Sequence, residues 1–304
     1  MTLGGETAVM EPADLIRLAL PLYSLSNSAF TVLRRLGDVV ARVDTPAGPV
    51  SLRVCTAGTV ATRLTEVSAF QNAAAGAGLT VPRREAARAL ILPDETPRWT
   101  VLSTWVDGEA PRPVTADLVR KLGRETARLH ALDFRPPQNW GGPVYDTTWL
   151  RTWWRDEAPR YLSEADQRRC ALAVERTAAF MEAHAPAARV IHSDLHFGNV
   201  LLTPDGQVAV LDFDGCAVAH PAFDLALTER ELLDYPDAPA LTAAYREGYA
   251  AESGRPFPGE AAEVFGVATG TAFLEWVYGS VNPEVRAQKE RWVPSLLDDL
   301  ALNG

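Results

Sequence analysis

The most constraining feature of this sequence is a pair of apolar runs near its centre that are joined by turn residues. The runs are VIHSDLHFGNVLL at 190–202 and QVAVLDFDG at 207–215, and Thr203-Pro204-Asp205-Gly206 lies between them. A Pro-Asp-Gly segment between two β-prone runs predicts a hairpin. In such a hairpin the polar residues inside the first run face the acidic residues that end the second.

Three polar side chains of this segment, Asp194, Asn199 and Asp212, are of the types that phosphoryl transfer requires. That reaction needs a carboxylate to accept a hydroxyl proton and oxygen ligands to hold Mg²⁺ on nucleotide phosphates. The spacing D-x-x-x-x-N matches a kinase catalytic loop, and Asp212-Phe213-Asp214 stands where such kinases have D-F-G. We therefore expect Asp194 to be the catalytic base, and Asn199 and Asp212 to be magnesium ligands.

Two other interpretations fit part of the same segment. Asp194-Leu195-His196 resembles the D-x-H that opens the binuclear metal site of calcineurin-like phosphoesterases, but the later G-N-H-D/E and G-H-x-H segments of that site are missing from the sequence. A purely structural hairpin, whose Asp and Asn side chains bond turn backbone, would not explain two acidic clusters that face each other. Phosphoryl transfer accounts for both clusters.

The segment also resembles the aminoglycoside phosphotransferase and choline kinase superfamily, which are small-molecule kinases with a protein-kinase-like fold. IHSDLHFGNVLL is similar to its H-G-D-L-H-x-G-N-h-L, VAVLDFDG to its I-D-F-D/E, and HPAFDLAL to the D-L-A that follows. Upstream, GPVSLRV, LTEVSAF…GLTVP and STWVDGEAP resemble further family segments. The resemblance covers residues 25–228 and implies a Mg-ATP-dependent enzyme with an alcohol group as acceptor.

The resemblance also implies residues that bind the nucleotide. Arg53 would contact the α- and β-phosphates, Glu66 would be its ion-pair partner, and Gly37-Asp38 would form the turn over the nucleotide. The backbone of residues 103–109, with Thr104 and Val106, would face the adenine in a cleft. Two features depart from the protein-kinase pattern: arginine replaces lysine at position 53, and the turn has one glycine rather than three.

Four further residues have expected supporting roles around the hairpin. We expect His192 to orient the loop by hydrogen bonds and Asp224 to bond the loop backbone. Two roles stay open at this point. Asp214 either contacts the metal or braces Asp212, and His196 is either a hydrogen-bonding partner or a ligand.

Periodicity predicts an α+β chain with two lobes. We expect residues 1–104 to form a small nucleotide-binding lobe with an antiparallel sheet and one packed helix, and residues 105–304 to form a larger, mostly helical catalytic and substrate lobe. The boundary is placed where β-prone sequence gives way to helical sequence, near 104–108. The expected strands are 30–36, 39–43, 49–55, 79–86, 88–92 and 98–106, and the expected helices are 12–20, 60–76, 115–132, 148–155 and others within 224–302.

Charge and cysteine content limit the partners. The net charge is −10, with 10 basic and 9 acidic residues in 1–104 and 19 basic and 30 acidic residues in 105–304. Nucleic acid and anionic membranes are therefore unexpected partners. Three scattered cysteines, no signal sequence and no long apolar run lead us to expect a cytoplasmic protein. The oligomeric state stays open.

The acceptor is the least determined part of the prediction. The acidic second part and an aromatic stretch at 140–154, interleaved with acids, favour a cationic or amine-bearing alcohol, aminoglycoside-, choline- or homoserine-like. The alternative interpretation, which the i, i+4 spacing of Trp149 and Trp153 favours, is that these aromatics face the core from a helix at 148–155. A Ser/Thr protein kinase of the stress-response type and a non-catalytic nucleotide-binding pseudokinase are the alternative functions.

Overall fold

The computed structural model describes residues 10–34, 37–280 and 283–302. Close packing divides these residues into two compact units. One unit contains the described residues up to Asn72 together with Pro82–Val106, and the other contains Ala73–Val81 together with the described residues from Asp107 onwards. Ala73–Val81 thus belongs to the second unit, although it lies between two stretches of sequence that belong to the first.

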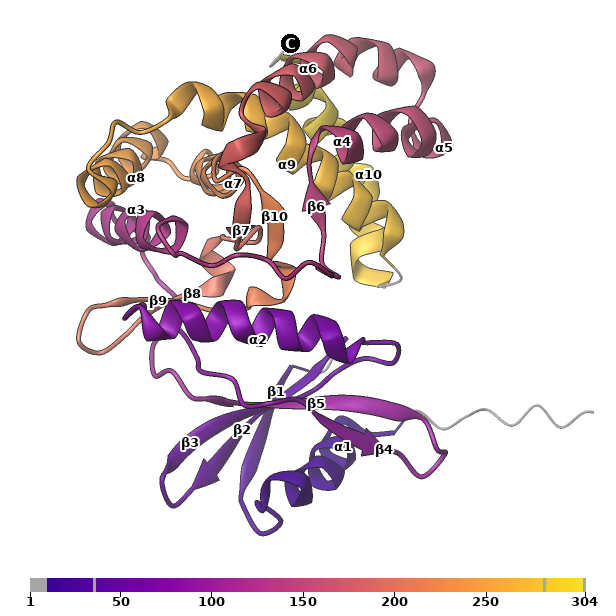
Figure 1. The fold of residues 1–304 in the computed structure, drawn as a ribbon, viewed down its shortest axis with the longest axis vertical. Helices are drawn as coiled ribbons and strands as arrows, with labels where there is room; N and C mark the ends of the chain where they lie inside the picture. The colour runs from indigo at the N-terminus through magenta and orange to yellow at the C-terminus, as the bar shows by residue number, and fades with distance from the viewer. Residues whose placement is uncertain (1–9, 35–36, 281–282, 303–304) are drawn as a thin grey trace, which may run out of the picture. The chain divides into compact units, whose positions relative to one another are not determined.

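The first unit is built on a five-stranded antiparallel sheet (Figure 1). Its strand order is β1-β2-β3-β5-β4. The antiparallel meander expected for residues 30–55 is confirmed, although residues 35 and 36, the last two of the strand expected at 30–36, lie outside the described residues. The strands are β1 (Phe30–Arg34), β2 (Val39–Thr45), β3 (Gly48–Val54), β4 (Arg88–Ile91) and β5 (Pro97–Thr104).

The two helices expected in this unit are confirmed as α1 (Pro12–Ala19) and α2 (Ala61–Gly76). Both pack on the sheet, where packing was expected only of the second. Leu52 and Val54 of β3 belong to the buried core that α1 completes. On the other face, Val101 of β5 packs against Leu64 of α2. Because side chains alternate along a strand, the intervening Arg53 lies on the α2 face.

The strand predicted at 79–86 is wrong. The described segment contains only isolated bridges, from Thr80 to Ala209 and from Arg84 to Ser103. Pro82 lies between these bridges and has no N–H to donate to a ladder, which prevents a continuous strand.

The second unit is mostly helical, as expected. A π-helical turn at Trp153–Glu157 joins α4 to α5, where the sequence predicts one helix over 148–155. Among the residues that the structure describes, no helix is both long and apolar enough to cross a bilayer. The helices are α3 (Ala116–His130), α4 (Thr147–Thr152), α5 (Ala158–Tyr161), α6 (Glu164–Ala183), α7 (Ala222–Leu232), α8 (Ala238–Ser253), α9 (Gly259–Gly279) and α10 (Pro283–Leu302).

Two small sheets lie among these helices. The predicted hairpin is confirmed as β8 (Val200–Leu202) paired with β9 (Val208–Val210). Residues 190 and 191, which begin the first apolar run, do not belong to this hairpin. They form part of β7 (Arg189–Ile191), which pairs with β10 (Ala217–Ala219) rather than with β9. A third strand, β6 (Val144–Tyr145), runs parallel to β10. The polar loop at 192–199 therefore connects two sheets.

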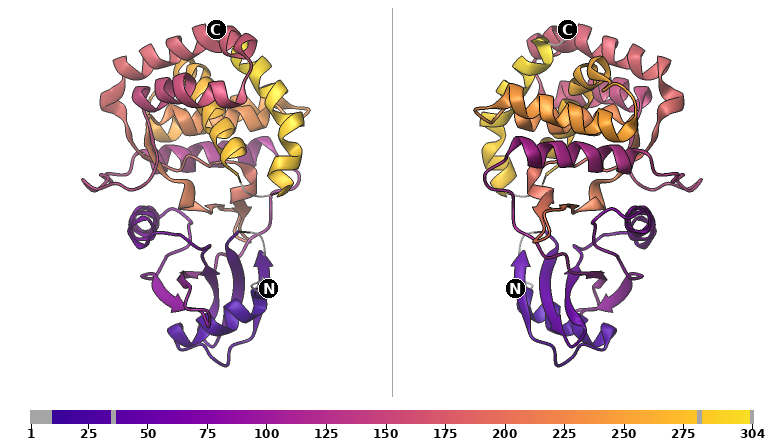
Figure 2. Two further views of the ribbon diagram at one scale, coloured as in Figure 1. Left: turned by 90° about the vertical axis from the view of Figure 1, so that its right-hand side faces the viewer. Right: turned by 90° about the vertical axis from the view of Figure 1, so that its left-hand side faces the viewer.

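Helices α3 and α8 lie side by side (Figure 2). Their backbones approach closely at two glycines. A Cβ atom on Gly248 would lie 2.0 Å from the carbonyl oxygen of Arg120, and one on Gly123 would lie 2.3 Å from that of Tyr245. These distances leave no room for a methyl group, so the helix backbones would have to separate.

We therefore expect Gly248→Ala to lower the free energy of unfolding by about 2–3 kcal/mol, as overpacking of a closed interface does. The matched control is Gly76→Ala, because a Cβ there meets nothing within 4 Å. Urea unfolding measures both variants. Equal unfolding midpoints for the two would contradict the close approach.

Candidate active site

The polar loop begins where β7 ends and is held in an unusual backbone conformation. Ser193 has a φ of 60°, in the left-handed region that side chains other than glycine rarely adopt. Its hydroxyl donates to the carbonyl of Gly215. A 3-10 turn at Phe197–Asn199 closes the loop and leads into β8. Both ends of the loop are thus anchored in strands.

Asp194 and Asn199 contact each other directly within this loop. The Asn199 amide nitrogen donates to the Asp194 carboxylate at 2.8 Å and to the Asp194 carbonyl at 2.9 Å. His196 lies beside them, with Nε2 3.6 Å from the Asp194 carboxylate. The Asp194 side chain is 47% exposed, so its carboxylate is open to a ligand.

The hairpin brings Asp212 to the same loop. Val200 pairs with Val210, and the Leu211 amide donates to the Asn199 carbonyl at 2.8 Å. The chain turns sharply after this bond, because Asp212 has a φ of 56°. A Cβ built on Gly215 would lie 3.3 Å from the Cβ of Asp194, so the segment after Asp212 passes close to the proposed base.

His192 orients the loop, as expected. Its Nδ1 accepts the backbone N–H of Asp194 at 3.2 Å, and its Nε2 donates to the Leu211 carbonyl at 2.9 Å. One buried imidazole thereby connects the backbone of Asp194 to the residue before Asp212.

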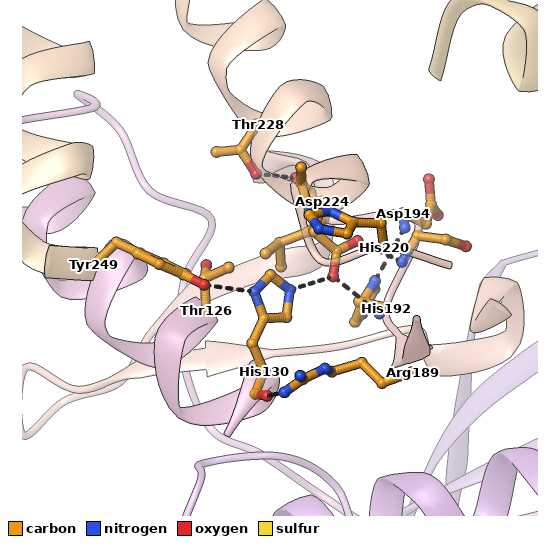
Figure 3. A network of polar contacts seen from close by, with 12 residues as sticks. Thr126, His130, Arg189, His192, Asp194, His220, Asp224, Thr228 and Tyr249 are labelled. Atoms are coloured by element: carbon orange, nitrogen blue, oxygen red, sulfur yellow. Dashed lines mark hydrogen bonds and ion pairs between the residues drawn. The ribbon is translucent and has the colours of Figure 1, made fainter. Parts of the chain in front are cut away.

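The expectation that Asp224 bonds the loop backbone is confirmed (Figure 3). Its fully buried carboxylate accepts the backbone N–H of His192 at 3.0 Å and that of Ser193 at 2.6 Å. His130 of α3 donates to the same carboxylate at 3.0 Å and contacts the Tyr249 hydroxyl at 3.2 Å. Asp224 thus stabilises the left-handed residue that precedes Asp194.

Asp224 is one of three residues on a single face of α7 that contact the loop. Thr228 donates to the Leu195 carbonyl at 2.8 Å, and Glu231 accepts the Phe197 N–H at 2.7 Å. Positions 224, 228 and 231 have the i, i+4, i+7 spacing of one helix face. Sequence reasoning missed Thr228 and Glu231, and their polar helical spacing from Asp224 is the signal that would have found them.

Two titratable groups beside the loop have shifted pKa values. The contact with the Asp194 carboxylate raises the pKa of His196. Burial raises the pKa of Glu231, although the Phe197 N–H opposes that shift. Both groups lie in a strongly negative part of the site, which also contains Asp194 and Asp212.

The donor atoms fit a magnesium ion that binds together with a nucleotide. Because the Asn199 amide nitrogen is bonded to Asp194, its amide oxygen is left as the ligand atom. Asp212 adds a carboxylate. The described residues contain no group of three or more His, Cys, Asp or Glu side chains that could hold a metal by itself. Mg²⁺ commonly uses one or two protein oxygens and completes its shell with phosphates and water.

The residues expected to contact phosphates lie in the first unit. Arg53 forms an ion pair with Asp38 at 3.5 Å, and the Asp38 carboxylate also accepts the Thr56 N–H at 2.8 Å. Gly37 has a φ of +72°, as the predicted turn requires. Arg53 and the turn are therefore brought together.

The remaining predicted nucleotide residues have other contacts. Buried Glu66 lies 3.5 Å from Arg63, and its pairing with Arg53 stays a prediction. Thr104 ends β5 and exchanges hydrogen bonds with the backbone of Arg83. Val106 is the last residue of the first unit.

The aromatic stretch divides into core and cavity residues. Trp153 is buried, and the Trp154 indole donates to the Thr271 hydroxyl at 2.9 Å. Tyr145 and Trp149 instead line a cavity. The core interpretation therefore holds for Trp153 and Trp154, and cation binding by Tyr145 and Trp149 stays a prediction.

Comparison with known proteins identifies the family. A model of the phosphotransferase enzyme family matches residues 34–261. The chain belongs to this family. It is therefore a phosphotransferase enzyme, and the resemblance noted in the sequence is confirmed. An uncharacterized protein of Deinococcus radiodurans is 32% identical over 233 residues, which are 72% of this chain and 67% of that protein.

Solved structures confirm the α+β, kinase-like fold. A microcompartment-associated aminopropanol kinase is 20% identical with a TM-score of 0.72, covering 95% of each chain. A putative aminoglycoside phosphotransferase of Ralstonia eutropha is 14% identical with a TM-score of 0.68, covering 96% of this chain and 97% of that one.

Proposed function

We propose that this phosphotransferase transfers the γ-phosphoryl group of ATP, in the presence of Mg²⁺, to a hydroxyl of a small molecule. The observation that supports the proposal best is the direct contact between Asp194 and Asn199 in a loop that the Asp212 segment closes from the other side. A carboxylate base and oxygen ligands in this order match the requirements of phosphoryl transfer.

The reaction assigns one role to each group. The acceptor oxygen forms a bond to the γ-phosphorus as the bond from that phosphorus to the β–γ bridging oxygen breaks, and ADP leaves. Asp194 accepts the hydroxyl proton. Asn199 and Asp212 would hold Mg²⁺, which supplies positive charge against the phosphate oxygens. Positioning and electrostatic stabilisation provide most of the rate enhancement in this class of reaction.

We propose that residues 1–104, together with the adjoining Val106, supply the contacts to the nucleotide, and that residues 105–304 supply the catalytic and acceptor residues. Arg53, supported by Glu66, would bind the phosphates, with Gly37 in the turn beside them. An arginine can bridge two phosphate oxygens with two donors. The backbone of Thr104 and Val106 would bind the adenine.

We propose an amine-bearing alcohol as the acceptor. Residues 105–304 have 19 basic and 30 acidic side chains, an excess that attracts cations and disfavours nucleic acid or an anionic membrane. The aminopropanol kinase of similar fold acts on such a compound by its name. We place the reaction in the cytoplasm, where the three buried cysteines, which form no disulfide, stay reduced.

Magnesium-dependent nucleotide binding tests the proposal. We expect ATP to bind the wild-type protein more tightly with Mg²⁺ than with EDTA, and Asp212→Asn to lower the Mg-ATP affinity by at least about 10-fold, because a charged ligand is lost. Calorimetric titration measures both, and Asp133→Asn, an exposed aspartate outside the site, is the matched control. The proposed function would be refuted if the wild-type protein does not bind ATP, or if its affinity for ATP does not depend on Mg²⁺.

A further inference from the structure

A cavity of about 470 Å³ lies in the second unit, beside β6, α4 and α9. Its walls come from the glycine-rich segment before β6 and from side chains of the three elements. This volume is in the range of small-molecule sites, which is about 300–1,000 Å³. The lining residues used below are Gly141, Pro143, Tyr145, Trp149, Glu275 and Trp276.

Contacts with one another and with the surrounding core hold the side chains of this cavity in place. The Trp149 indole donates to one carboxylate oxygen of Glu275 at 3.0 Å. The Tyr145 ring lies 4.6 Å from that of Trp149 and stacks on Phe223 at 4.8 Å with an interplanar angle of 4°. The cavity is thus preorganised, which lowers the entropy lost when a ligand binds.

The residues that line the cavity favour a ligand with a positive charge. Glu275 is the only charged residue among those that line the cavity, and three large aromatic rings accompany it. Trp276 is 50% exposed, so its ring is available to a ligand. Aromatic faces and a carboxylate both attract an ammonium group, and a single carboxylate balances a single positive charge.

The cavity lies at the edge of the sheet from which the catalytic loop emerges. β7 ends at Ile191, opposite Ala217, the first residue of β10, and then leads into the loop with Asp194. β6 runs parallel to β10, and the Pro143 carbonyl before β6 accepts the Val218 N–H at 3.0 Å. The lining segment at 141–143 and the loop therefore lie at the same end of this sheet, on either side of β10.

We propose that this cavity binds the ammonium group of the acceptor, and that the acceptor is a small alcohol with one positive charge. The proposal rests on the proposed phosphotransferase function and narrows its substrate class. The Glu275 carboxylate and the Trp149, Trp276 and Tyr145 rings hold the ammonium group, while the hydroxyl extends towards Asp194. A polycationic aminoglycoside would leave all but one of its charges unmatched in this cavity.

Direct binding without nucleotide tests the charge preference. Calorimetric titrations would compare choline with its uncharged dimethylbutanol isostere, and aminopropanol with propanediol. Ethanolamine and kanamycin would be titrated alongside choline and aminopropanol. We expect the tightest small ammonium alcohol to bind about 10-fold or more tightly than its uncharged counterpart and than kanamycin. Equal affinity for the uncharged counterpart, tighter binding of kanamycin, or no binding of any ammonium alcohol would overturn the proposal.

Variants test the assignment to this cavity. Glu275→Gln keeps the size of the side chain and its contact with the Trp149 indole, and we expect it to weaken ammonium binding by about 10-fold and to remove most of the preference over the uncharged isostere. Trp276→Leu should also weaken binding of the ammonium alcohol. Glu263→Gln, an exposed glutamate on the same helix α9, is the matched control and should bind as the wild type does.

Kinetic measurements separate this inference from the proposed function. In an assay of ADP release, Glu275→Gln should raise the KM for the ammonium alcohol and leave kcat nearly unchanged. Phosphoryl transfer with an unchanged KM in this variant would overturn the ammonium site and leave the kinase function intact. Binding of the ammonium alcohols without ADP release from Mg-ATP would refute the function and retain the ammonium site.

Discussion

Asp194→Asn should lower kcat by about 10³-fold, because the variant loses the group that accepts the hydroxyl proton. The asparagine side chain has nearly the same shape, and its amide oxygen can still accept the Asn199 amide N–H that now bonds the carboxylate. We therefore expect the fold and the affinity for Mg-ATP to be retained. Assays of ADP release with the acceptor found by direct binding, together with nucleotide titration, measure these quantities.

The control for this variant is Asp133→Asn, which makes the same chemical change at an exposed position outside the site. It should keep wild-type turnover. A kcat for Asp194→Asn within about threefold of the wild type would exclude a base role for Asp194, since positioned proton transfer contributes far more than that. If Mg-ATP binds but no hydroxyl compound is ever phosphorylated by the wild-type protein, the non-catalytic alternative is favoured instead.

Asp224→Ala should lower the free energy of unfolding by about 3–5 kcal/mol. The buried carboxylate accepts two backbone N–H groups of the loop and the His130 ring. Removing it leaves these donors buried without acceptors, and each such donor costs about 1–3 kcal/mol. Urea unfolding, followed by circular dichroism, measures the change.

The matched control is Asp234→Ala, at an exposed aspartate just beyond α7, which should change stability by less than about 0.5 kcal/mol. If the Asp224 variant is too unstable to purify, Asp224→Asn retains one acceptor oxygen and should show a smaller loss of stability with a lowered kcat. Stability and turnover of Asp224→Asn equal to those of the wild type would contradict the role in holding Ser193.

The local chemistry of the site could be predicted from sequence because it depends on neighbours in the chain. The spacing from Asp194 to Asn199 and the Pro-Asp-Gly turn act over a few residues, and turn residues determine which strands form a hairpin. The meander of the first unit follows from alternation and turn residues in the same way. Hydrophobic periodicity likewise indicated α3 and a mostly helical second unit, although it did not single out α6 at Glu164–Ala183.

Long-range arrangement could not be predicted in this way. β7 leaves the hairpin to pair with β10, and Ala73–Val81 packs with the second unit, because each segment finds its hydrogen-bond partners far along the chain. Helix α1 packs on the sheet of the first unit because its apolar face needs a buried surface, whichever element supplies it.

The sequence by itself therefore determined the residue types of the catalytic loop, the hairpin that presents them and the family to which they belong. Tertiary structure decided how they are held and what surrounds them. The left-handed conformation of Ser193 is stabilised by buried Asp224 of α7 and by the Gly215 carbonyl. The contact between Trp149 and Glu275, 126 residues apart, joins two walls of the cavity of the proposed ammonium site. Such contacts depend on packing between distant elements, whose geometry no local spacing in the sequence encodes.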